Sequence, residues 1–413
     1  MREPPCGGFP WGTRQNWTLT FVRLSSWLNV NYLLIFDMDK IKIMHIVQSS
    51  GGVARYLSMY LKYSDKNRFE HILICSLDYK IEKMEYLAEH VEYLSMGRQI
   101  SIINDAKGIW AIRKFIKKYM PDVIYMHSSK AGALGRLADI GFKNIVLYNP
   151  HGWAFNMNNI SVIKKKVYAL IEKVLAYKTN MIIAISAWEK ESAIKYKICC
   201  SDKIHIIPSG VDVCLYDEER GRYDLNRSKL KIPLNAYIIG MVGRISYGKG
   251  PDLFIKAAAL IKEKIPNAFF VIVGDGEERA SVENLLSEMR LKDDFLITGW
   301  VSNPIEYIQL FDQAMLLTRW EGFGLVLTEY MLAEKPIITT RVGAVPDLMQ
   351  QGKNGIMIDV GDIEGIVEAS FKLYTDNQYR QTLVSNGRST VRNLYDIRCT
   401  VKEHERLLMS ARY

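Results

Sequence analysis

Residues 320–336 of this chain read Trp-Glu-Gly-Phe-Gly-Leu-Val-Leu-Thr-Glu-Tyr-Met-Leu-Ala-Glu-Lys-Pro, and they are the most informative segment for its fold. An apolar run at residues 314–317 precedes it and is short enough to form a buried parallel strand. Residues 325–333 have the length of a helix, which Pro336 would end. The sequence therefore predicts a strand, a glycine turn and a helix in succession.

The glycine turn has the composition of a phosphate-binding site. Gly322 and Gly324 allow the backbone to approach a ligand closely, and a helix start presents free amides that suit a phosphate. Those amides belong to Phe323, Gly324 and Leu325. Carboxylates would repel phosphates, so we expect Glu321 and Glu329 to accept hydrogen bonds from sugar hydroxyls instead. The alternative is an ordinary turn whose glycines serve packing and whose glutamates are solvated.

Glu-Gly-Phe-Gly-Leu at residues 321–325, with a second glutamate eight positions after the first, resembles the Glu-x7-Glu signature of the retaining group-1 (family-4) glycosyltransferases, the glycogen-synthase-like kind. The resemblance extends over nearly the whole chain after residue 38. It implies an α/β chain with the GT-B fold, in which two Rossmann-like, doubly wound domains face each other across a cleft. It also implies that Glu321 holds hydroxyls of a donor sugar, that Glu329 binds a ribose and that the three amides bind a diphosphate.

The length of the chain suits two domains. A chain of 413 residues is too long for one ordinary core and suits two domains of roughly 150–200 residues. Strands that alternate with helices predict a parallel sheet in each domain. By composition and by the resemblance we expect an N-terminal domain at residues 38–208, a polar linker at 209–235, a nucleotide-sugar-binding domain at 236–390 and a helix that crosses back to the first domain at 391–413.

Residues 1–37 differ in composition from the rest of the chain. Arg23 and Asn29 interrupt their apolar run, so a membrane-spanning helix is not expected, and the absence of a small-residue cleavage site disfavours a signal peptide. Our hypothesis is that Met38 or Met44 is the biological start and that the preceding residues come from an upstream start choice.

Positive charge is concentrated in the first half of the chain. Residues 1–200 contain 28 Lys and Arg against 16 Asp and Glu, whereas residues 201–413 contain 26 against 29. No zinc finger, RNP-like strand or basic helix-turn-helix pattern accompanies this charge, so nucleic acid is not the expected partner. An anionic membrane surface, or a lipid diphosphate within it, fits better; a solvated basic face without a partner is the alternative. Residues 161–176 combine three lysines with apolar positions at helical spacing, which predicts a surface helix with one packed face and one basic face.

The first domain contains two turns with glycine at the ends of expected strands. Gly51 and Gly52 follow the strand expected at residues 41–47 and match the family's N-terminal glycine loop, which borders the donor phosphates and the acceptor. His151 follows a strand expected at residues 146–149, at the edge where such sheets bind ligands. A histidine in a Pro-His-Gly turn is structural more often than not. Its match to the family's His-Gly pair implies a place in the active site, near the reacting face of the sugar.

The second domain begins with a basic glycine loop. Gly243, Arg244 and Lys249 follow its first expected strand. Departure of a nucleoside diphosphate builds negative charge, which an arginine fork and a lysine point charge can neutralise without a metal ion. The order of these residues matches the family's diphosphate-binding loop; without that match they would be ordinary surface cations. Val301 follows a later strand, where relatives hold the nucleotide base by backbone contacts.

Together with these residues, the resemblance implies a retaining hexosyltransferase that needs neither metal nor cofactor and uses His151, Arg244, Lys249 and Glu321 for catalysis. It would move a hexose or deoxyhexose from a nucleotide-diphosphate sugar to a saccharide, with a lipid-diphosphate-linked acceptor expected from the basic first domain. The expected setting is capsule, exopolysaccharide or lipopolysaccharide assembly at the cytoplasmic membrane face, and six cysteines without a disulfide framework suit that reducing compartment. Two alternatives remain: a GT-B sugar-nucleotide epimerase, which Glu-x7-Glu disfavours, and a catalytically silent nucleotide-sugar-binding subunit, which the intact charged residues disfavour.

Overall fold

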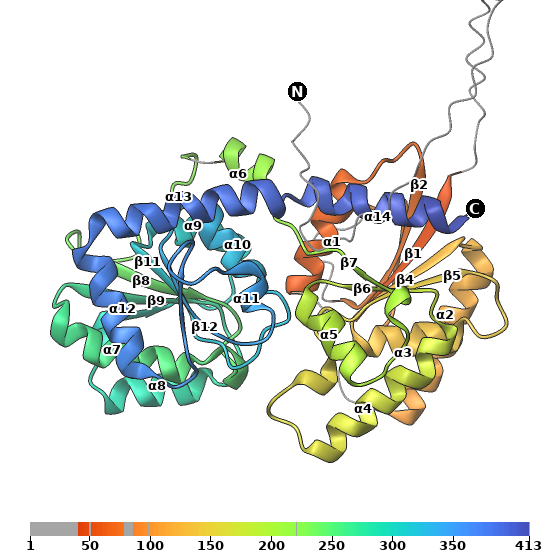
Figure 1. The fold of residues 1–413 in the computed structure, drawn as a ribbon, viewed down its shortest axis with the longest axis horizontal. Coiled ribbons are helices and arrows are strands. Elements are labelled where there is room, and N and C mark those ends of the chain that lie inside the picture. Colours follow the sequence, from red (N-terminus) through yellow and green to blue (C-terminus); the bar gives the residue numbers. More distant parts are fainter. Residues whose placement is uncertain (1–39, 49–50, 78–85, 98–99, 220, 413) are drawn as a thin grey trace, which may run out of the picture.

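The computed structural model of the protein describes residues 40–48, 51–77, 86–97, 100–219 and 221–412. The hypothesis about residues 1–37 lies outside this part of the chain. Figure 1 shows two lobes side by side, with the last two helices running along both. Each lobe is built on one parallel sheet with helices on both faces.

The first domain has seven strands in the order β3-β2-β1-β4-β5-β6-β7, all parallel. The five inner strands are short runs in which nearly every residue is buried, because helices cover both faces of a parallel sheet, whereas the edge strands β3 and β7 are more exposed. The strands are β1 (Ile41–Val47), β2 (Phe69–Cys75), β3 (His90–Tyr93), β4 (Val123–His127), β5 (Ile145–Asn149), β6 (Met181–Ala184) and β7 (Ile204–Ile206). The helices are α1 (Gly52–Tyr63), α2 (Ile102–Tyr119), α3 (Ser129–Ala138), α4 (Val162–Leu175), α5 (Ala187–Lys195) and the 3-10 turns η3 (Ala154–Asn156), η4 (Ala176–Lys178) and η5 (Ser201–Lys203).

The second domain has six strands in the order β10-β9-β8-β11-β12-β13, again all parallel. The strands are β8 (Tyr237–Val242), β9 (Ala268–Val273), β10 (Phe295–Ile297), β11 (Gln313–Leu316), β12 (Ile337–Thr340) and β13 (Ile356–Ile358). The helices of the linker and this domain are α6 (Val213–Glu219), α7 (Pro251–Lys264), α8 (Arg279–Glu288), α9 (Pro304–Leu310), α10 (Leu325–Leu332), α11 (Val345–Leu348), α12 (Ile363–Thr375), α13 (Asn377–Leu394), α14 (Ile397–Arg412) and the 3-10 turns η6 (Tyr247–Lys249) and η7 (Lys292–Asp294).

In both sheets the order in which successive strands are added reverses beside the first strand. In the first sheet β1 lies between β2 and β4, and in the second β8 lies between β9 and β11. At such a point the connecting helices leave to opposite faces, so the carboxyl ends of the two strands open a crevice where ligands bind. The predicted α/β class with two doubly wound domains is confirmed.

The C-terminal tail forms two helices with a break between them. The break falls at Tyr395 and Asp396, because the backbone there pairs with the linker: Val211 N–H donates to Tyr395 O at 2.8 Å, and Ile397 N–H donates to Val211 O at 3.0 Å. Beyond the break, α14 lies against α1 of the first domain (Figure 1). The second-domain helix α13 is therefore continued by a helix that belongs to the core of the first domain.

Helix α4 corrects the expectation for residues 161–176. It buries Ala169, Glu172 and Leu175. Glu172 faces inward because its Oε2 lies 2.7 Å from the guanidinium of the buried Arg136. The apolar side chains that this rotation leaves exposed are Val162, Ile163, Val167, Leu170, Ile171 and Val174. The prediction that α4 packs through an apolar face is therefore wrong. No helix in the described part of the chain is long and apolar enough to cross a bilayer.

Candidate active site

A lysine–glutamate ion pair lies at the switch point of the second sheet. Lys249 is on η6, after β8, and Glu321 is in the loop after β11. Because β8 and β11 are neighbouring parallel strands, these two loops start side by side. Lys249 Nζ lies 2.6 Å from Glu321 Oε2, and the Glu321 side chain is only 12% exposed. The structure thus joins two of the residues predicted to be catalytic.

The loop that carries Glu321 is held by the turn after β12. Ala344 N–H donates to Glu321 O at 3.1 Å. Gly343 has a φ of +52°, and a Cβ on it would lie 2.1 Å from the same carbonyl oxygen. Only glycine fits at this approach, so any side chain at position 343 would displace the Glu321 loop.

Arg244 pairs with a different carboxylate. Its Nε lies 2.8 Å from Glu277 Oε2, and the two side chains are 41% and 53% exposed. Within the described residues, no hydrogen bond or ion pair joins Arg244 to Lys249 or Glu321. An ion pair this exposed contributes about 0–1 kcal/mol, so an anionic ligand can compete for the guanidinium at small cost.

The turn before α10 is anchored from both sides. Phe323 is buried and packs edge-on against Tyr395, with ring centroids 5.6 Å apart. Leu325 packs against apolar side chains of both domains. Gly324 is the N-cap, with a φ of +87° and no side chain to bond the helix start. Among the described residues, the predicted phosphate-binding amides, those of Phe323, Gly324 and Leu325, donate no hydrogen bond.

Glu329, one turn into α10, contacts the first domain. Its Oε1 lies 3.0 Å from Nε of Arg55 on α1, and the Glu329 side chain is 6% exposed. Burial raises the pKa of the Glu329 carboxyl, and the Arg55 charge acts against that rise. Our sequence analysis missed Arg55. The position of Arg55, one helical turn after the glycine loop at Gly51, could have indicated a cation close to the site.

The glycine turns of the first domain lie against these second-domain loops. Gly51 caps α1 and Gly52 begins it, and a Cβ on Gly52 would lie 3.9 Å from Leu325 Cδ1. A Cβ on Gly322 would lie 3.1 Å from Gly152 Cα, next to His151. The structure therefore brings the N-terminal glycine loop and the His-Gly turn to the predicted sugar-binding and phosphate-binding turn.

His151 is half-buried and held in an uncommon backbone conformation. Its φ is +48°, and its N–H donates to Asn149 Oδ1 at 2.9 Å. Its ring Nε2 lies 3.1 Å from Nδ1 of His127, at the end of β4. Burial lowers the pKa of His151 to about 3, so its imidazole is neutral at neutral pH.

A buried glutamate missed by our sequence analysis lies between the same turns. Glu189 is fully buried; its Oε2 accepts Ile185 N–H at 2.9 Å, and its Oε1 has no hydrogen-bond partner among the described residues. That oxygen lies 3.6 Å from where a Cβ on Gly322 would be. Burial raises the pKa of Glu189 to about 8, so the carboxyl is largely protonated at neutral pH. In the sequence, the spacing Ser186-x-x-Glu189 indicated only a helix start.

The remaining predicted binding residues lie in the loops that follow strands β8 and β10. Gly243 follows β8, and its N–H donates to Val273 O at the end of β9. Val301 is half-buried in the loop after β10, where Gly299 bridges to Gly274. These loops extend the site away from Glu321, along the carboxyl edge of the sheet. Within the described ranges, no group of three or more His, Cys, Asp or Glu side chains is arranged to hold a metal ion.

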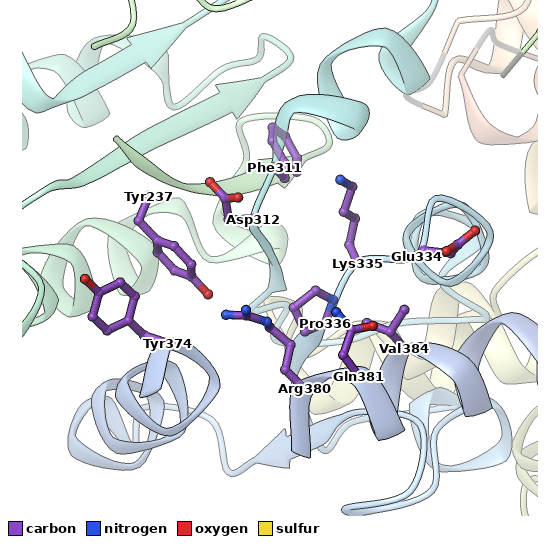
Figure 2. A pocket seen from close by; sticks show the side chains of 10 residues that line it. All are labelled: Tyr237, Phe311, Asp312, Glu334, Lys335, Pro336, Tyr374, Arg380, Gln381 and Val384. Atoms are coloured by element: carbon purple, nitrogen blue, oxygen red, sulfur yellow. The ribbon is translucent and has the colours of Figure 1, made fainter. Parts of the chain in front are cut away.

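A separate hollow of about 700 Å³ lies at the other edge of the second sheet (Figure 2). Tyr237 opens β8, Asp312 precedes β11 and Pro336 precedes β12, so these lining residues mark the amino ends of the strands. Figure 2 shows Arg380, from α13, directed toward the same space. The ion pair and the glycine turns follow the carboxyl ends, so this hollow is outside the candidate active site.

Sequence comparison assigns the chain to a family. The profile described as Glycosyl transferases group 1 matches residues 223–390, and that described as Glycosyltransferase Family 4 matches residues 50–214. The UDP-Gal:alpha-D-GlcNAc-diphosphoundecaprenol alpha-1,3-galactosyltransferase of Escherichia coli is 30% identical over 368 residues, which cover 87% of this chain and 94% of that protein. This chain belongs to the group-1 glycosyltransferases.

Further relatives of this glycosyltransferase agree with that assignment. The capsular polysaccharide biosynthesis glycosyltransferase CapM of Staphylococcus aureus is 28% identical and covers 89% of this chain and 97% of its own. Among solved structures, Anabaena HepE with UDP-glucose has a TM-score of 0.76 at 21% identity, and the sucrose-phosphate synthase of Thermosynechococcus elongatus has 0.75 at 20%. Each covers 90% of this chain and 100% of the other. At these identities the likeness shows the fold, and the expected GT-B architecture is confirmed.

Proposed function

We propose that this glycosyltransferase moves a hexose or deoxyhexose from a nucleotide-diphosphate sugar, with retention and without a metal ion, to a lipid-diphosphate-linked saccharide. Its setting is the assembly of a cell-surface polysaccharide at the cytoplasmic face of the plasma membrane. The E. coli relative is named for such an acceptor and an alpha linkage, and the S. aureus relative for capsular polysaccharide biosynthesis. The observation that carries the proposal is the Lys249–Glu321 pair at the switch point.

This pair matches the two chemical parts of a nucleotide sugar. Glu321 is an acceptor suited to sugar hydroxyls, and Lys249 is a point charge suited to the diphosphate. Arg244 can join it, because its exposed pair with Glu277 costs little to break. The uncapped amides at the start of α10 add donors for the same anion. These groups neutralise the charge that builds on the leaving diphosphate, which is the task a metal ion performs in other enzymes.

The carboxyl groups near the site are poorly suited to attack the sugar. Glu189 is buried and largely protonated, since its pKa is raised to about 8. Glu329 is paired with Arg55, and Glu321 with Lys249. We therefore propose that the departing phosphate oxygen removes the proton from the attacking acceptor hydroxyl. The new carbon–oxygen bond then forms on the face from which the phosphate leaves, which retains the anomeric configuration.

Helix α4 supports a membrane-bound acceptor. Its six exposed apolar side chains lie on a helix that also carries Lys164, Lys165, Lys166 and Lys173. Apolar side chains that enter the headgroup region, with cations that contact acidic lipids, fit an anionic bilayer surface. Figure 1 shows α4 and α14 on opposite sides of the first sheet, so the interdomain tail leaves α4 uncovered.

A donor screen tests the proposal. Purified protein is mixed with UDP-, GDP- and dTDP-sugars, and slow hydrolysis and thermal stabilisation are scored. Lys249→Ala should lower kcat with the donor so identified by about 100-fold or more, the effect of losing one preorganised anion-binding donor. Lys256→Ala, at an exposed position on α7, is the matched control. Near-normal turnover in Lys249→Ala would exclude its role. Thermal stabilisation by a donor without any turnover, with or without membrane lipid extract, would favour the silent nucleotide-sugar-binding subunit, and no response of either kind would contradict a nucleotide-sugar site.

Vesicle binding tests the membrane surface. Replacing Lys164, Lys165 and Lys166 by Gln should weaken binding to vesicles with acidic lipids by about 100-fold, because each lysine near such a surface contributes about 1 kcal/mol. The matched control is the triple Gln variant of three exposed second-domain lysines, Lys256, Lys264 and Lys353. Equal weakening in both variants would show nonspecific charge attraction instead of docking through α4.

A further inference from the structure

Four of the seven histidines form a hydrogen-bonded row across the first sheet. His71 is on β2, His45 on β1, His127 at the end of β4 and His151 after β5, so the row crosses four neighbouring strands. The nitrogen–nitrogen distances are 3.0 Å from His71 Nδ1 to His45 Nε2, 3.2 Å from His45 Nδ1 to His127 Nε2 and 3.1 Å from His127 Nδ1 to His151 Nε2. One end of the row is therefore in the candidate active site.

The other end of the row is fixed by the C-terminal helix. His71 Nε2 lies 2.9 Å from Ser64 Oγ, at the end of α1. Glu405 of α14 lies with its Oε1 3.1 Å from that Oγ and 2.8 Å from Asp65 N. A carboxylate only accepts, so the Ser64 proton is committed to Glu405. Ser64 Oγ must then accept its second hydrogen bond from His71 Nε2–H.

The same direction of hydrogen-bond donation, toward Ser64, holds for each ring of the row in turn. Burial lowers the pKa of His71 and His151 to about 3 and places those of His45 and His127 well below the ordinary value, so each ring is neutral with one N–H. His71 donates its one ring N–H, at Nε2, to Ser64 Oγ. Its Nδ1 is therefore unprotonated and accepts a hydrogen bond from His45 Nε2–H. By the same step His45 accepts from His127, and His127 accepts from His151. Every ring of the row is then the Nε2–H tautomer.

A fifth histidine, His404, has the opposite tautomer. Nδ1 of His404, on α14, lies 2.8 Å from Thr400 O, and a carbonyl only accepts. The proton of His404 is therefore on Nδ1, and its Nε2 accepts the Tyr125 O–H at 2.9 Å. His404 therefore provides an Nδ1–H ring in the same core with which the Nε2–H rings of the row can be compared.

We propose that Ser64 and Glu405 are positioning residues that hold His151 as the Nε2–H tautomer, so that its Nδ1 accepts a hydrogen bond from a hydroxyl of the bound sugar. This assignment rests on the proposed function, because it places the donor sugar at the His-Gly turn. It gives α14 a part in the chemistry of the site, through the contact of Glu405 with Ser64.

The direction of the row determines which group on the sugar is preferred. Nδ1 of His151 has no hydrogen-bond partner in the described part of the chain, so its lone pair is available to a ligand. A hydroxyl can donate to that lone pair, whereas a carboxylate at the same place would oppose one lone pair with another. A reversed row would present N–H to the sugar and would lose this preference.

The first test measures the ring tautomers directly in the protein without sugar. Long-range proton–nitrogen NMR spectra of the 15N-histidine-labelled chain at pH 7 distinguish Nε2–H from Nδ1–H. We expect Nε2–H at His45, His71, His127 and His151, with Nδ1–H at His404. A ring of the row that is Nδ1–H or doubly protonated would overturn the proposed direction, whatever the enzyme binds.

The second test breaks the far end of the row. Ser64→Ala removes the acceptor of His71 and should shift the rings toward Nδ1–H, with kcat/KM for the donor reduced about tenfold. Ser64→Thr keeps a hydroxyl and should restore both the spectrum and the rate. Ser58→Ala is the matched control, since Ser58 is on the same helix and bonds only the backbone oxygen of Arg55. Unchanged tautomers and unchanged kcat/KM in Ser64→Ala would refute the positioning role.

The third test uses monodeoxy analogues of the donor sugar. Wild type should lose about tenfold or more in kcat/KM with the analogue that lacks the hydroxyl bound by His151, and Ser64→Ala should lose less with the same analogue. Equal losses in the two proteins would overturn the contact with the sugar. Absence of turnover with every donor would overturn that contact together with the proposed function, while the ring spectrum would still decide the direction of the row.

Discussion

Acidification should destabilise the first domain through its buried histidines. The rings of His45, His71, His127 and His404 are fully buried. Burial lowers the pKa of each, to about 3 for His71, to about 4 for His404 and well below the ordinary value for the other two. Because the folded pKa is below the unfolded value near 6.5, the unfolded chain binds more protons between the two. This stability is complete above about pH 6.5 and is lost as the pH falls toward the folded values.

The size of the effect follows from the same shifts. Each buried ring should reduce the free energy of unfolding by up to about 1 kcal/mol from pH 7 to pH 6 and by about 2 kcal/mol from pH 7 to pH 5. The four rings together lose about 8 kcal/mol. Glu189 acts in the opposite sense, since its pKa is raised to about 8, and recovers about 3 kcal/mol over the same range. The net loss of about 5 kcal/mol is comparable with the whole stability of a domain.

Urea unfolding at pH 7, 6 and 5, followed by the histidine ring resonances, measures this loss. Six histidines lie in the first domain and His404 lies on α14 against it, so these signals report that domain selectively. Glu189→Gln removes the opposing contribution and should steepen the pH dependence by about 1 kcal/mol per pH unit. A first-domain stability that changes by less than about 1 kcal/mol between pH 7 and pH 5 would refute the reasoning, as would an unchanged slope in Glu189→Gln.

Three further substitutions test the site and its support. Gly343→Ala places a Cβ 2.1 Å from the Glu321 carbonyl oxygen and should reduce kcat by about 100-fold with the fold intact by circular dichroism; normal turnover would show that the loop adapts. Arg55→Met leaves the buried Glu329 without its partner and should lower the free energy of unfolding, measured with urea, by about 1–2 kcal/mol. No change would mean that the pair is energetically neutral. Glu172→Leu leaves the buried Arg136 guanidinium unpaired and should cost about 3–5 kcal/mol, most of which the Arg136→Met double variant should recover; an equal cost in both would point to packing instead of charge.

The fold class and the loops expected to carry the chemistry could be predicted from the amino-acid sequence. The apolar run before Trp320, the glycines after it and Pro336 specify strand, turn and helix through short-range preferences that operate wherever the segment lies. Strands that alternate with helices then allow few topologies, because parallel strands need crossover connections. Lys249 and Glu321 could be expected together for the same reason, since both follow strand ends of one sheet. The roles of the site residues in binding and catalysis stay predictions.

The contacts of several residues of the chain depend on tertiary packing and could not be predicted from the sequence. Arg55 meets Glu329, Arg244 meets Glu277 and Ser64 meets Glu405 across separations that no local pattern encodes. Helix α4 shows the consequence most directly. Its spacing predicted an apolar packed face, yet a buried ion pair to another helix set its rotation.

The histidine row depends on tertiary structure for a further reason. His45 lies two strands and His71 three strands from the strand that precedes His151, and the rings form one row only because the register of four strands places them on one face. Register is a property of the assembled sheet, since a shift of one residue would turn a ring to the other face. The tautomer of each ring then depends on the next partner along the row. Chemistry of this kind is fixed by the packed core and cannot be read from any single stretch of the chain.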